Sequence, residues 1–370
     1  FFLGLTALLT AITYGIQPYG GQTTGWTSPW VLGGLVGGVA LLGVFVLIEL
    51  HSPAPMLDLR LFRIRAFSAG NLAALLAAIG RGGLQFMLII WLQRIWLPLH
   101  GYAFEDTPLW AGIYMLPITI GFLVAGPVSG TLSDRFGARG FASVGLLIVT
   151  ITFLLYLVMP VDFEYWQFAV VSLLSGIGSG MFGAPNRTAI MNSVPASERG
   201  AASGVTGTLQ NAGSSLSIGV FFSLMIVGLS ASLPTTLRAG LLAHGVPVAA
   251  AEQIAALPPV GSLFAAFLGY NPIESLLGPS GVLASLHPAD AAALTGHEFF
   301  PQLISGPFHD GLVVVFGVAA AMSLVGALAS LARGKRFVHD EHVAALTAES
   351  PDVAVLASAR PVASDQEGHR

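Results

Sequence analysis

Long apolar runs, each followed by a short polar connection, repeat along most of this chain. The runs fall at about 1–17, 31–49, 66–97, 108–131, 141–159, 165–192, 201–229 and 310–333. A helix needs roughly 20 consecutive apolar residues to cross the hydrocarbon core of a bilayer, and these runs are near that length. The pattern therefore predicts an all-α integral membrane protein with about eight transmembrane helices.

Composition supports a membrane protein and excludes several other classes. Hydrophobic residues make up 54% of the chain and charged residues 9%, against roughly 25% in soluble domains. Cysteine is absent and the net charge is only -4, so we expect neither a disulfide framework nor a nucleic-acid partner. Because the chain opens on Phe1 inside an apolar run, we expect it to be the C-terminal part of a longer protein.

Basic residues gather on alternate connections, which predicts the orientation in the membrane. Connections on the cytoplasmic side of a membrane protein carry an excess of Lys and Arg. If the connection near 135 is cytoplasmic, the same side carries Arg60, Arg63, Arg65, Arg135, Arg139, Arg199, Arg333, Lys335 and Arg336. The six tryptophans fall at the opposite boundaries, at positions 26, 30, 91, 96, 110 and 166. We therefore predict a multi-pass protein of the cell membrane, with the 130–139 loop and the C-terminal tail in the cytoplasm.

Two segments stand apart from the spans. The outer connection 230–308 contains apolar runs that are too short to cross, so short interfacial or folded-back helices and a disordered loop are both open. The tail 339–370 is rich in Ala, Ser, Asp and Glu, and we expect it to be disordered. It contains the run His339-Asp340-Glu341-His342, but no further ligand cluster completes a coordination shell. We predict no metal site and no cofactor.

Polar side chains within the spans mark the candidate substrate cavity. Polar groups in hydrocarbon are tolerated mainly where they face a bundle interior or a wet cavity. The candidates are Arg81, Gln85, Asn186, Arg187, Gln210 and Asn211. Arg187 is also near enough to the inner helix end to extend its charge toward the interface. Gln210 belongs to a polar stripe that either lines a path or joins helices by hydrogen bonds.

Arg81 is the most informative of these residues. It falls near the middle of its span, where an arginine costs at least about 2.5 kcal/mol. Gln85, one turn later, shares its face, and Gly82 and Gly83 let a helix or a substrate come close. The alternative is a structural arginine that is satisfied by carbonyl groups or by a partner elsewhere in the protein.

The glycine pairs and the positions of the acidic residues lead to two further predictions about the spans. The pairs Gly176-xxx-Gly180 and Gly200-xxx-Gly204 predict surfaces for close helix contact. The acidic residues nearest the spans, Glu49, Asp162, Glu164 and Asp310, all lie near the ends of the apolar runs. We therefore expect any carboxylate that carries a coupling proton to lie outside this sequence.

One connection carries a specific motif. Residues 130–139 read Gly130-Thr-Leu-Ser-Asp134-Arg135-Phe-Gly137-Ala-Arg139, in which the glycines allow a tight turn. Asp134 is placed to cap the next helix and to pair with Arg135 or Arg139. The pattern G-x-x-x-D-R-x-G-x-R between two spans resembles the signature loop of the major facilitator superfamily, apart from Ala138, where a basic residue is common. We expect these residues to form a gating loop.

The resemblance extends over nearly the whole chain. A helix pair at 1–49, the Pro55-Met56-Leu57-Asp58-Leu59 connection and a six-helix set are similar to the fourteen-helix drug:proton antiporters of that superfamily. The resemblance implies an extra central pair with its loop in 1–65, a C-terminal six-helix domain in 66–338, and a missing N-terminal six-helix half. It also implies alternating access, with proton-coupled export of amphipathic or cationic compounds. The first, second, fourth and fifth helices of the set would line the cavity, and the third and sixth would lie outward.

Other functions leave more of the sequence unexplained. The runner-up is an exporter of one endogenous metabolite, a siderophore-like molecule or a lipid-linked compound. A membrane scaffold would fit the helices but would leave Arg81 and the signature loop without a role. An enzyme would need clusters of His, Asp or Glu at catalytic spacing, and all nine histidines lie outside the spans. We therefore expect no catalytic residues, and small-molecule substrate, protons and the lipid bilayer as partners.

Overall fold

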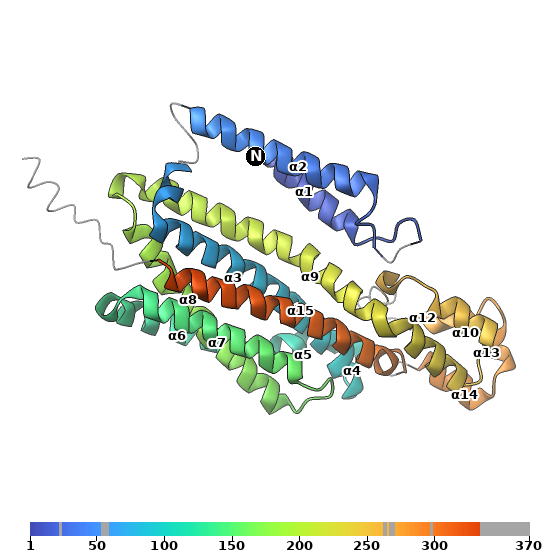
Figure 1. Ribbon diagram of the computed structural model, residues 1–370. Coiled ribbons are helices and arrows are strands. Elements are labelled where there is room, and N and C mark those ends of the chain that lie inside the picture. Colours follow the sequence, from blue (N-terminus) through green and yellow to red (C-terminus); the bar gives the residue numbers. More distant parts are fainter. Residues whose placement is uncertain (22–23, 53–58, 262–264, 266–270, 297–298, 334–370) are drawn as a thin grey trace, which may run out of the picture.

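The protein is built from helices that run roughly along one direction (Figure 1). The computed structural model describes residues 1–333 apart from 22–23, 53–58, 262–264, 266–270 and 297–298. Within those residues there are helices and no strands. The predicted tail 339–370 with its His339–His342 run, and most of the Pro55–Leu59 connection, lie outside the described residues.

Among the described residues, seven helices are long and apolar enough to cross a membrane, which confirms the predicted all-α membrane class. The N-terminal pair consists of α1 (Phe2–Gly15) and α2 (Pro29–His51). Of the two, α2 is one of the seven, whereas α1 is a shorter apolar helix of 14 residues. Of the pair, α1 lies against α9, where the side chain of Ile12 packs over Gly219.

Six spans form the main bundle. The first is a continuous helix made of α3 (Arg65–Ile90), the π-helical turn η2 (Trp91–Trp96) and α4 (Leu97–Leu99). The remaining spans are α5 (Thr107–Tyr114) with α6 (Leu116–Phe136), α7 (Ala138–Val158), α8 (Tyr165–Asn192), α9 (Arg199–Ala243) and α15 (Phe299–Leu331). Because the backbone has no partners in hydrocarbon other than its own helical hydrogen bonds, each apolar run folds in this way.

Packing divides the bundle into two groups of three spans. One group is α6, α7 and α8, in which α8 touches both of the others. The other is α3, α9 and α15, and α15 also packs on α7. The connection between α6 and α7 defines one end of the bundle, called here the loop end. The opposite end, where α9 and α15 extend furthest, is called the cap end (Figure 1).

Short helices cover the cap end. They are α10 (Val248–Ala255), α12 (Pro272–Leu277), α13 (Val282–Ser285) and α14 (Pro288–Thr295). With 45 residues, α9 is about 68 Å long, more than twice the thickness of the hydrocarbon core. Its second half meets the cap through an ion pair from Arg238 to Glu252 at 3.5 Å. Ser232 on α9 also donates to the carboxylate of Asp310 on α15 at 2.5 Å.

Candidate functional site

A cavity of about 530 Å³ lies between the two groups of helices. Its wall combines residues of α3, η2, α5, α6, α7, α8 and α9. Most lining side chains are apolar, including the rings of Phe122, Phe153 and Phe182. The polar lining residues are Arg81, Gln85, Gln93, Thr119, Ser175, Ser179 and Gln210. A mainly apolar wall with a few polar groups is typical of small-molecule sites.

One stripe of the first span supplies the most strongly polar part of the wall. Arg81, Gln85, Ile89 and Gln93 recur every four residues, which keeps them near one face of the helix. From Ala74 to Gln93 the lining extends over about 28 Å of helix rise, close to the full hydrocarbon thickness. Arg81 therefore lies deep in the cavity, about 24 Å from the start of α3 at Arg65.

Two glycines beside Arg81 allow α9 to come close. A Cβ at Gly82 would lie 3.2 Å from the Cβ of Ser217, and one at Gly83 would overlap the ring of Phe221. The partner of these glycines is therefore a helix, which was one of the two possibilities left open by the sequence. This contact also brings α9 close enough for Gln210 to reach the same cavity as Arg81.

Glycines also join α6 to α8. A Cβ at Gly176 would fall on the carbonyl group of Ile118, and a Cβ at Gly180 would lie 2.9 Å from the nitrogen of Gly126. The predicted packing surface at Gly176 and Gly180 is confirmed. The second predicted surface, at Gly200 and Gly204, was wrong, because no other part of the described structure lies within 4 Å of a Cβ at either position.

The third span of the six-helix set contributes to the cavity, which the resemblance did not imply. Leu146, Val149 and Phe153 of α7 are part of the lining, whereas α15 contributes none of it. Gly145 explains the approach, since a Cβ there would lie 2.6 Å from the carbonyl oxygen of Gly178 on α8. With α7 held so close to α8, its side chains extend through to the cavity.

Three of the six predicted cavity residues lie away from this lining. Asn186 is buried at the loop end, where its amide donates to the carbonyl of Gly70 at 3.3 Å and its oxygen accepts from Arg333. It thus links α8 to α3 and to the residues that follow α15. Arg187 and Asn211 are exposed and line no part of the cavity.

Burial has an electrostatic cost at Arg333. Its side chain is 6% exposed, and desolvation lowers its pKa to about 10. The C-terminal ends of α8 and α15 are at the same end of the bundle, and the partial negative charge of a helix C-terminus favours a cation. On burial this guanidinium loses its hydrogen bonds to water, and the side-chain oxygen of Asn186 replaces one of them with a neutral acceptor.

The motif loop sits between α6 and α7. Gly130, Asp134 and Arg135 belong to the last turns of α6, and Gly137 makes the reversal with φ of +91°, a conformation that favours glycine. The predicted cap was wrong: α7 begins after Gly137 without a side-chain cap, and Asp134 is still part of α6. Arg139 follows in the first turn of α7 and is exposed.

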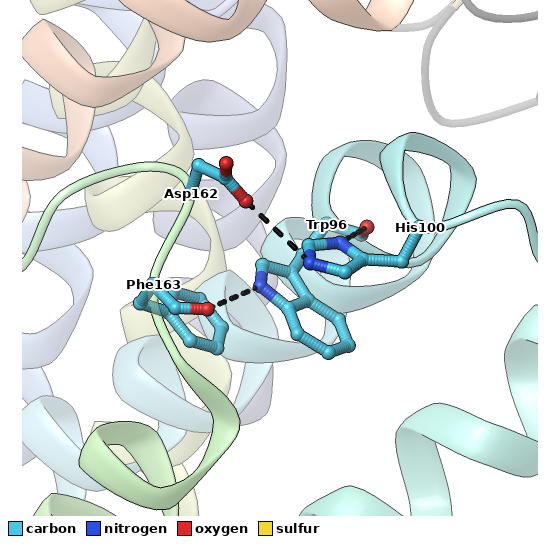
Figure 2. Close-up of polar contacts among 4 residues, drawn as sticks. All are labelled: Trp96, His100, Asp162 and Phe163. Carbon is cyan, nitrogen blue, oxygen red and sulfur yellow. Dashed lines mark hydrogen bonds and ion pairs between the residues drawn. The ribbon is translucent and has the colours of Figure 1, made fainter.

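The cap end of the first span is tied to the connection between α7 and α8 (Figure 2). Trp96 donates its indole N–H to the carbonyl of Phe163 at 2.9 Å, and the two rings stack 5.1 Å apart. His100 stacks on Trp96 at 3.8 Å, with Nδ1 2.8 Å from the Trp96 carbonyl and Nε2 3.5 Å from Asp162. A carbonyl and a carboxylate both accept hydrogen bonds, so each ring nitrogen of His100 faces an acceptor.

Several lining residues were missed by the sequence reading. Gln93, Thr119, Ser175 and Ser179 line the cavity but were not among the predicted cavity residues. The available signal was the spacing of Ser175 and Ser179 by four residues on a face rich in glycine. Hydroxyls also satisfy themselves on their own helix, as Ser217 does on the carbonyl of Ser214 at 2.6 Å, so this signal is weak.

Metal-ligand chemistry has no candidate within the described ranges. No group of three or more His, Asp or Glu side chains there is placed to hold a metal ion. The arrangement instead offers one cationic side chain, several neutral hydrogen-bonding groups and aromatic rings around a space of ligand size.

Comparison with known proteins gives a consistent set of relatives. The family model of the Major Facilitator Superfamily matches residues 1–218. The methyl viologen resistance protein of Salmonella typhimurium is 30% identical over 262 residues, which cover 70% of this chain and 50% of that protein. The tetracenomycin C resistance and export protein of Streptomyces glaucescens is 27% identical over 307 residues, 83% of this chain and 51% of that protein. The chain thus spans about half the length of these relatives. A solved bacterial homologue of the human lysosomal transporter Spinster covers 90% of this chain, and this chain 69% of it, with 17% identity and a TM-score of 0.40.

Proposed function

We propose that this chain, which belongs to the major facilitator superfamily, supplies the C-terminal transport domain of an exporter of amphipathic small molecules. Residues 66–338 would form that domain and 1–65 an accessory helix pair. The observation that carries the proposal is the cavity of about 530 Å³, which lies among membrane-length helices and falls within the size range of drug-sized sites. Two relatives that are named for drug resistance support export as the direction of transport.

Within this proposal the cavity residues have distinct roles. Arg81, Gln85 and Gln210 contact the substrate from α3 and α9, while the aromatic rings hold its apolar part. Asn186 holds the loop ends of the helices together instead of touching substrate. Alternating access requires the two halves of the transporter to rock against each other, with the loop from Gly130 to Arg139 facing the cytoplasm.

Coupling to protons is the second part of the proposal. No Asp or Glu lies among the described lining residues, so the coupling proton is carried by another part of the intact transporter. Single replacements of Glu49, Asp162, Glu164 and Asp310 are therefore expected to leave substrate-driven proton flux intact in proteoliposomes. Loss of flux at any one of them, with substrate binding retained, would place the coupling group in this chain.

Thiol labelling tests the cavity assignment directly, since the chain has no cysteine of its own. Cysteines at Arg81 and Gln85 are expected to react with a membrane-impermeant thiol reagent and to be protected by transported compounds. Leu324→Cys is the control, because Leu324 is exposed on α15, which does not line the cavity. If neither cavity position reacts in any transport state, the cavity is not the substrate route.

A further inference from the structure

The charge inside the cavity points to a class of substrate. Arg81 is the one charged side chain among the described residues that line it. The other polar groups of the wall are neutral amides and hydroxyls, which bind by hydrogen bonds but carry no charge to balance a cation. This half of the cavity therefore has a net positive charge.

Arg81 is available to a ligand. Its side chain is exposed, and within the described structure no carboxylate or hydrogen-bond acceptor contacts its guanidinium. Five N–H donors in a planar fork match the two oxygens of a carboxylate. The Arg94 guanidinium, by contrast, already lies over the ring of Phe104 at 4.6 Å.

The depth of Arg81 makes an anionic ligand favourable. The Cα of Arg81 lies about 24 Å along the span from Arg65 and about 27 Å from Leu99, further than its side chain can reach toward either end of the span. A cation at that depth is costly, and attraction to an anion grows as the local dielectric constant falls. A bound anion would therefore reduce the electrostatic cost of holding the Arg81 cation at this depth.

We infer that this cavity selects amphipathic compounds that carry a carboxylate or a similar anionic oxygen group. The anionic group pairs with Arg81, Gln85 and Gln210 add hydrogen bonds, and the apolar body packs on Phe122, Phe153 and Phe182. As a statement about substrates, this inference rests on the proposed export function. It predicts that the cavity binds anionic compounds more tightly than cationic drugs, because the guanidinium of Arg81 would repel a cation.

The test uses three probes that share one ring system and differ in charge: 2-naphthoate, 2-naphthamide and 2-naphthyltrimethylammonium. Radiolabelled probes are equilibrated with the purified intact transporter. Naphthoate is expected to bind about 10-fold or more tightly than naphthamide, and the ammonium probe most weakly. Arg81→Gln should weaken naphthoate by about 10- to 100-fold and naphthamide far less, whereas Arg81→Lys should keep most of the charge preference. Arg65→Gln is the control, with the same change on the same helix outside the cavity.

Equal binding of naphthoate and naphthamide by the wild-type protein would overturn the inference without any variant. Equal weakening of all three probes by Arg81→Gln would also overturn it, because Arg81 would then act only on structure. Transport in proteoliposomes is scored separately. Charge-selective binding without transport refutes the export function alone, whereas transport that ignores probe charge and Arg81 refutes only the substrate class.

Discussion

The contact between α6 and α8 at Gly176 provides a quantitative test of how the cavity wall is held. A Cβ at this position would lie 2.8 Å from the carbonyl carbon of Ile118 and 2.9 Å from the nitrogen of Phe122. Both are backbone atoms, so no side-chain rotation relieves the overlap. Unstrained contacts between carbon atoms begin near about 3.5 Å, so Gly176→Ala requires the two helices to separate by at least roughly 0.7 Å, and the carbonyl oxygen of Ile118, which lies closer still, requires more.

The expected cost follows from studies of overpacked cores. Inserting a methyl group where the neighbours cannot yield destabilises a protein by about 1 to 3 kcal/mol. We expect Gly176→Ala to lower the Tm of the purified protein by on the order of 5 °C. Because Ile118 and Gly176 both line the cavity, probe binding should weaken as well. Thermal unfolding followed by tryptophan fluorescence measures the first effect and equilibrium dialysis the second.

Gly183→Ala is the matched control on the same helix and the same cavity. A Cβ at Gly183 has only the ring of Phe122 nearby, at 4.0 Å. Both substitutions gain about 1 kcal/mol of helix propensity, so any difference between them reports the contact with α6. A Gly176→Ala protein that melts at or above the temperature of the Gly183→Ala protein would refute the close approach of α6 and α8.

Three further predictions concern the two ends of the bundle. Asn186→Leu removes the acceptor of the buried Arg333 and should reduce the free energy of unfolding by about 1.5 to 3 kcal/mol. Asn211→Leu, at an exposed amide, should cost far less, and equal costs would contradict a stabilising hydrogen bond between Asn186 and Arg333. Asp134→Asn should reduce export much more than expression, since this residue lies in the last turn of α6 at the proposed gating loop; normal export rates in the inserted variant would exclude a gating role. His100→Ala should lower the Tm of the purified protein, because it removes the stacking on Trp96 and the contact with Asp162 (Figure 2); an unchanged Tm would contradict a stabilising role for this contact.

Much of the fold was determined by local properties of the sequence. Each apolar run is long enough to cross a bilayer, and its backbone finds no hydrogen-bond partners in hydrocarbon. A helix satisfies those groups within the run, so the all-α membrane class followed directly. Helical spacing likewise placed Arg81 and Gln85 on one face, and the structure has both in one cavity. The glycine pair at Gly176 and Gly180 signalled close packing before its partner helix was known.

Only the tertiary structure decided which faces meet. Periodicity groups residues on one side of a helix, but the rotation of that helix about its axis depends on how small residues pack against its neighbours. Asn186 therefore turned toward Arg333, a residue 147 positions away, while Gln210 turned toward the cavity. The contact of Gly145 with α8 likewise brought α7 into the wall, through an interhelical fit that no single span encodes.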